Sequence, residues 1–87
     1  MKRIYESSRG FLEVESFNTF DSQEIWLTFF DEEGWPRLRK SWGDDAFGQP
    51  DFVLARQLLL SLRFEGFPDV EAERLAAQMT VDLQEHQ

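Results

Sequence analysis

Apolar and polar positions alternate along the first half of the chain and recur at helical spacing along the second half. The alternation is clearest in Phe11–Phe17 and Glu24–Phe30, which we predict to be half-buried strands. Lys2–Glu6 and Trp35–Trp42 are predicted strands on either side of these two. Because Pro36 has no N–H to donate to a ladder, we place its strand at an edge of the sheet. The pattern predicts an antiparallel meander of three to four strands.

The second half has the features of two amphipathic helices. Pro50 suits a first helical position and Gly66 a C-terminal stop, so we predict one helix over residues 50–64. Asp69 can cap a second helix, which we predict over residues 69–86. Strands that are followed by helices indicate an α+β fold. We therefore expect one domain, residues 1–87, with the sheet in residues 1–42 and both helices packed on one of its faces.

The turn Asp31–Gly34 predicts a register in which Leu27 faces Leu38 and Thr28 faces Arg37. This register separates a buried apolar face from a face that carries large aromatic and charged side chains. The buried face would hold Leu12, Val14, Ile25, Leu27, Phe29 and Leu38. The other face would hold Glu13, Glu15, Trp26, Thr28, Phe30, Trp35, Arg37 and Arg39. Either this second face is a binding surface, or a loop or the termini cover it.

Composition adds a strong negative charge, because the chain has 17 acidic and 9 basic residues and a formal net charge of -8. Such a field repels nucleic acids and anionic membranes and attracts basic partners. Only Arg37, Arg39 and Lys40 form a basic cluster, which disfavours direct nucleic-acid binding. The chain has no apolar run as long as a membrane span and no apolar segment typical of a signal peptide, so we expect a cytoplasmic protein.

No motif indicates catalysis. The chain lacks cysteine, and its single histidine, His86, lies next to the last residue. The acidic clusters do not have the ligand spacing of a calcium loop, and the five glycines form no phosphate-binding loop. We therefore expect a protein that is not an enzyme and has no cofactor or metal.

In size, acidity and lack of catalytic motifs, the chain is similar to bacterial toxin-immunity proteins and to phage-encoded inhibitors such as anti-CRISPR and anti-restriction proteins. That similarity is one of composition only. From the acidic clusters and the aromatic residues beside them, we predict a small inhibitor or adaptor that occludes a basic, nucleic-acid-binding surface of a partner protein. Carboxylates would replace phosphates there, and aromatic side chains would supply buried anchors. The candidate contact residues are Asp31, Glu32, Glu33, Asp44, Asp45, Trp26, Phe30, Trp35 and Trp42.

The alternative function is structural. In this hypothesis the aromatic sheet face and the edge strand Trp35–Trp42 form a symmetric homodimer.

Overall fold

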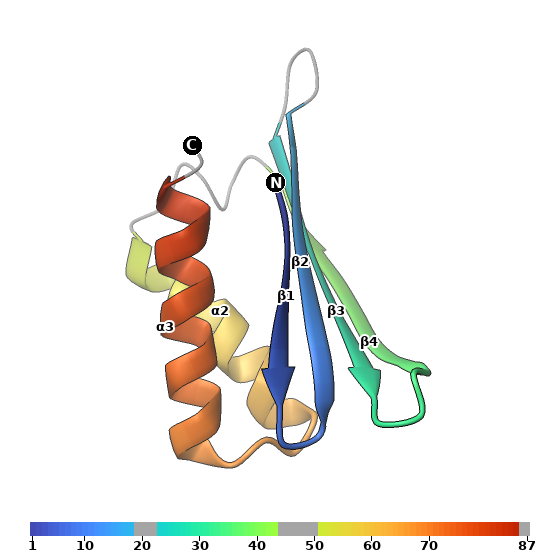
Figure 1. Ribbon diagram of the computed structural model, residues 1–87. Helices are drawn as coiled ribbons and strands as arrows, with labels where there is room; N and C mark the ends of the chain where they lie inside the picture. Colours follow the sequence, from blue (N-terminus) through green and yellow to red (C-terminus); the bar gives the residue numbers. More distant parts are fainter. Residues whose placement is uncertain (19–22, 44–50, 86–87) are drawn as a thin grey trace. The chain divides into compact units, whose positions relative to one another are not determined.

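The computed structural model describes residues 1–18, 23–43 and 51–85. Four strands precede two helices: β1 (Lys2–Ser7), β2 (Gly10–Asn18), β3 (Gln23–Asp31), β4 (Pro36–Trp42), α2 (Asp51–Phe64) and α3 (Asp69–Glu85) (Figure 1). This order confirms the predicted α+β fold, a four-stranded antiparallel sheet followed by two helices. The chain divides into two compact units, Met1–Asp45 and Ala46–Gln87, and each is described by itself. The packing of the helices on one face of the sheet stays a prediction.

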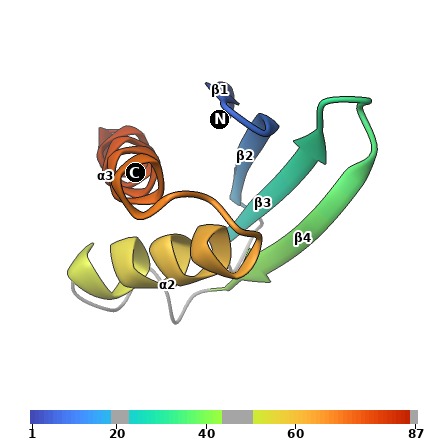
Figure 2. The same cartoon turned by 90° about the horizontal axis from the view of Figure 1, so that it is seen from below.

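The sheet is a simple meander in which each strand pairs with its neighbours in the sequence, in the order β1-β2-β3-β4. All three pairings are antiparallel. Ser8 and Arg9 alone connect β1 to β2, because Ser7 already pairs with Gly10. The strand directions turn progressively from β1 to β4 (Figure 2), as the right-handed twist of sheets requires.

One face of the sheet is apolar and buried. Leu12, Val14, Ile25 and Leu27 are 0% exposed, and Phe29 is nearly as buried. These five residues alternate along β2 and β3 with half-buried neighbours, so their side chains point to one side of the sheet. We call this side the apolar face. Its membership confirms the predicted division of the two central strands.

The predicted register between β3 and β4 is wrong by two residues. The structure pairs Leu27 with Lys40 and Phe29 with Leu38, whereas the sequence pattern placed Leu27 opposite Leu38. The ladder is irregular between Phe29 and Phe30, where a bulge shifts the pairing. Because the shift is two residues from Leu38 to Trp42, these side chains keep their predicted faces, whereas the bulge places Pro36 opposite Phe30.

The β3–β4 turn is the physical reason for this shift. The N–H of Asp31 donates to the carbonyl of Trp35 at 2.9 Å, so Trp35 closes the turn and does not pair with Phe30. Gly34 has a φ of 87°, the left-handed conformation expected at the end of this turn. Thr28 consequently pairs with Arg39 rather than Arg37.

The helical unit is a hairpin with a sharp connection. Gly66 has a φ of 88°, and the N–H of Phe67 donates back to the carbonyl of Leu62 at 3.2 Å, which closes α2 in a Schellman-type cap. Arg63 at the end of α2 pairs with Asp69 at the start of α3 at 3.0 Å. Neither described helix has the length and apolar character that crossing a bilayer requires.

Candidate protein-binding surface

The side of the sheet opposite the apolar face carries both aromatic and charged side chains. We call it the polar–aromatic face. Cross-strand partners share a side, so the register shows which side chains lie on this face. On β2, β3 and β4 they include Phe11, Glu13, Glu15, Trp26, Thr28, Phe30 and Arg39. All of these except Arg39 are half-buried, which leaves part of each aromatic ring accessible.

Phe11 and Phe30 form an aromatic pair across β2 and β3. They are direct partners in the ladder, and their rings stack with centroids 4.8 Å apart and planes 16° apart. A stacked cross-strand pair adds about 0.5–1.5 kcal/mol beyond the area it buries. The pair therefore fixes a flat apolar patch beside the β3–β4 turn.

Trp26 lies near the other end of β3. The guanidinium of Arg39 sits over its ring, with the central carbon 4.6 Å from the ring centroid. The indole Nε1–H donates to Oε2 of Glu24 at 3.2 Å. Trp26 is thus held by a cation on its face and a carboxylate at its edge, which orients the ring within the sheet.

Two carboxylates occupy the middle of this face. Glu13 and Glu15 lie two residues apart on β2, and Nζ of Lys2 is 3.4 Å from Oε1 of Glu13. The hydrogen bond with Glu13, followed by burial, raises the pKa of Glu15, against the opposing charges of Lys2 and Arg39. The neighbouring carboxylate of Glu13 therefore favours the protonated form of Glu15.

The β3–β4 turn is braced by one side chain, Asp31. Its Oδ1 accepts hydrogen bonds from the N–H of Glu33 at 3.0 Å and of Trp35 at 2.8 Å. Its Oδ2 accepts from Nε of Arg37 at 2.7 Å. Burial acts to raise the pKa of Asp31, but these donors and the Arg37 charge outweigh it and hold the pKa below its ordinary value. Asp31 is therefore an internal brace with its oxygens already occupied.

The braced turn presents three exposed side chains at one end of the sheet. Glu32 and Glu33 are exposed, and Trp35 is 69% exposed. We call Glu32, Glu33 and Trp35 the acidic tip. It places a large aromatic side chain within three residues of two negative charges, on a backbone that the Asp31 carboxylate holds in place.

The structure brings together only some of the candidate contact residues. Trp26 and Phe30 share the polar–aromatic face, whereas Trp35 lies at the tip. Trp42 lies at the far end of β4 from Trp35, opposite Ile25 and on the side of the apolar face, with Nζ of Lys40 5.7 Å from its ring centroid. A single patch containing both Trp35 and Trp42 does not form. Asp44 and Asp45, two further candidates, fall outside the described residues.

Two contributors to the surface were not among the candidates. Phe11 completes the stack with Phe30, and Lys2 neutralises Glu13. Phe11 could have been found from its spacing, because it lies two and four residues before Glu13 and Glu15 and so shares their side of β2. Lys2 could not, because the sequence pattern does not give the register of β1 against β2.

Within the described residues, no group of three or more histidine or acidic side chains is placed to hold a metal ion. Comparison of the chain with protein-family models, with curated proteins and with solved structures found no match. The surface itself is therefore the basis for a functional proposal.

Proposed function

We propose that the protein is a stoichiometric inhibitor or adaptor, without catalytic activity, that occludes a basic, nucleic-acid-binding surface of a partner protein. The observation that carries this proposal is the acidic tip. Trp35 is 69% exposed. It follows the exposed carboxylates of Glu32 and Glu33 in the chain and directly precedes the charged strand β4. Tryptophan is enriched among interface hot spots, so a tryptophan with this exposure is a candidate anchor.

The negative charge of the protein indicates that the partner's surface is positively charged. The net charge of -8 attracts a basic surface over long range and accelerates encounter. Glu32 and Glu33 would then occupy positions that phosphates occupy on that surface, and Asp44 and Asp45 remain candidates for the same role. Asp31 is engaged in bracing the turn, so its part in recognition is indirect.

Anchoring would come from Trp35. Its backbone N–H is fixed by Asp31 before any partner arrives, so less conformational entropy is lost on binding. The nearby Phe11–Phe30 stack extends the apolar contact area onto the polar–aromatic face. The proposed division of roles is that the carboxylates attract the partner and the aromatic side chains hold it, in a cytoplasmic setting.

The proposal is tested by affinity capture from lysate, followed by surface plasmon resonance with the captured protein. Charge reversal at the tip, Glu32→Lys with Glu33→Lys, should mainly slow association and flatten its dependence on salt. Trp35→Ala should instead accelerate dissociation by tenfold or more, about 1.4 kcal/mol, because a buried anchor acts after docking.

Matched controls come from the helical unit. Glu65→Lys with Glu85→Lys changes the net charge equally, and Phe64→Ala removes an aromatic side chain that is 86% exposed. Equal effects of the tip variants and these controls on the two rates would overturn the role of the tip. Capture of nucleic acid in place of protein would overturn the proposed partner. A tight dimer lost with Trp26→Ala would favour the alternative, a homodimer formed through the sheet.

A further inference from the structure

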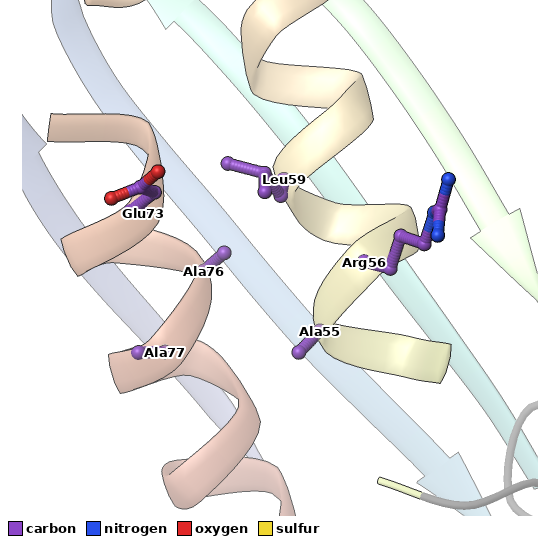
Figure 3. Close-up of a pocket in the computed structure, with 6 residues that line it drawn as sticks. All are labelled: Ala55, Arg56, Leu59, Glu73, Ala76 and Ala77. Atoms are coloured by element: carbon purple, nitrogen blue, oxygen red, sulfur yellow. The ribbon is translucent and has the colours of Figure 1, made fainter. Parts of the chain in front are cut away.

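Helices α2 and α3 enclose an apolar groove on the helical unit. In Figure 2, α3 is seen along its axis while α2 is seen from the side, so the two helices cross and do not run parallel. The groove between them has a volume of about 280 Å³. Its lining residues are Ala55, Arg56, Leu59, Glu73, Ala76 and Ala77 (Figure 3). Three of the six are alanines, which let another backbone approach closely.

The two charged residues of the groove lie on different helices. Arg56 belongs to α2 and Glu73 to α3, and their charged ends extend away from each other to the two sides of the groove (Figure 3). Among the described residues, neither forms an ion pair. The groove thus has an apolar floor between one positive and one negative charge, neither of which is paired with another described residue.

Apolar surface continues from the groove along α3. Val70 and Val81 are 80% and 47% exposed, and with Ala77 they follow the spacing i, i+7, i+11 of a single stripe. Glu73 lies beside this stripe. Exposed valines beside a groove of this kind are typical of a surface that packs against another helix.

We propose that this groove binds a second copy of the chain, with α2 of one protomer lying over α3 of the other. A two-fold axis along the groove repeats each contact. It places Arg56 of one protomer against the partner's Glu73, and Glu73 against the partner's Arg56. The opposite arrangement, α2 over α2, would place two Arg56 side chains together. The two charges therefore select a self-complementary contact and a single orientation.

The edge strand β4, a second candidate surface for self-association, is disfavoured by its charges. Strand β4 is an edge strand with Arg37, Arg39 and Lys40 within four residues. Antiparallel pairing of two β4 strands would bring these cations together, which costs free energy at each like-charged pair. The groove has the reverse property, since its charges attract under the same symmetry.

The experiment is sedimentation velocity over a concentration series that extends to the millimolar range, with four variants. Arg56→Glu and Glu73→Arg should each weaken the dimer by about tenfold, because each reverses one member of both symmetric pairs. The double variant carrying both changes should return the dissociation constant to the value of the unmodified protein. Arg9→Glu is the matched control for Arg56→Glu, since Arg9 is exposed in the β1–β2 turn, lies outside the helical unit, and carries the same change in net charge.

Each result has a definite reading. Weakening by the two single reversals, rescue by the double variant and an unchanged dimer in Arg9→Glu would support the proposal. A monomer at every concentration would overturn it. Equal weakening by Arg56→Glu and Arg9→Glu, or a double variant that is no better than the singles, would also overturn it. Circular dichroism of every variant shows that the helices are retained.

Discussion

Gly10 and Asp31 are direct partners at the end of the β2–β3 ladder, and no space remains between their backbones for a side chain on Gly10. A Cβ at this position would lie 2.8 Å from the carbonyl carbon of Asp31 and would collide with the carbonyl oxygen of Phe30. The φ of Gly10 is 138°, which L-residues rarely adopt. This glycine is what allows the β1–β2 turn to lie against the start of the β3–β4 turn.

The first prediction follows from that contact. Gly10→Ala should destabilise the protein by about 2 kcal/mol or more, because it combines backbone strain with a collision against main-chain atoms. Gly34→Ala is the control, since Gly34 also has a positive φ but has open space around it. It should cost about 1 kcal/mol, from backbone strain alone. Urea denaturation measures both, and equal losses would contradict the close contact.

The second prediction concerns the brace in the β3–β4 turn. Asp31→Asn keeps an oxygen for the backbone donors and loses the charge that pairs with Arg37. The pKa of Asp31 is lower in the folded protein than its ordinary value of 3.8. Its contribution to stability is therefore present at neutral pH and is lost as pH falls through the folded-state pKa. The melting temperature of Asp31→Asn should be lower than that of the unmodified protein at neutral pH, and the two should converge in acid.

Circular dichroism melts from neutral pH to pH below 3.8 provide the measurement. Glu33→Gln is the control, because only the backbone of Glu33 takes part in the brace. A constant difference between Asp31→Asn and the unmodified protein at all pH values would show that the charge on Asp31 is not the stabilising element.

The third prediction concerns Glu15, whose contribution to stability has the opposite pH dependence. The pKa of Glu15 is raised in the folded protein, so the folded state favours its protonated form. Stability linked to this group is highest at low pH and is lost as pH rises through the folded-state pKa. Glu15→Gln should raise the melting temperature at neutral pH, and the gain should disappear in acid. Glu6→Gln, an exposed change on β1 that lies on the same face of the sheet, should leave the melting temperature unchanged.

The fourth prediction tests the apolar face. Leu27 is 0% exposed and lies mid-strand between Val14 and Lys40. Leu27→Ala should cost about 2–5 kcal/mol, since it leaves a cavity among buried side chains. Thr28→Ala changes the next residue, whose side chain points to the other face, and should cost far less. If urea denaturation shows almost no loss of stability in Leu27→Ala, the side chain of Leu27 does not lie on the buried apolar face.

The sequence pattern predicted the strands and their faces because both depend on a period of two. The same property explains why it failed for the register of β3 and β4. A shift of two residues leaves every side chain on its face, so Leu27 opposite Leu38 and Leu27 opposite Lys40 fit the alternation equally well. Only the geometry of the turn at Trp35 distinguishes them, and that geometry depends on hydrogen bonds of the Asp31 side chain.

The candidate surface was predicted in the same partial way. Trp26 and Phe30 share a face because they are four residues apart on one strand, which the sequence states directly. The Phe11–Phe30 stack depends on pairing between two strands and could not be read from either one. Asp31 was counted as an acidic contact, although an aspartate at the first position of a turn commonly bonds the backbone two residues on.

The meander order also bears on how the chain folds. Every strand pairs only with the strand before or after it, and α2 is followed directly by α3. Each pairing therefore closes a short loop at small entropic cost, and no strand must wait for a distant segment. Such local topologies fold faster than sheets with long crossovers. We expect refolding from urea to be rapid and single-exponential. The hairpins should form one after another along the chain.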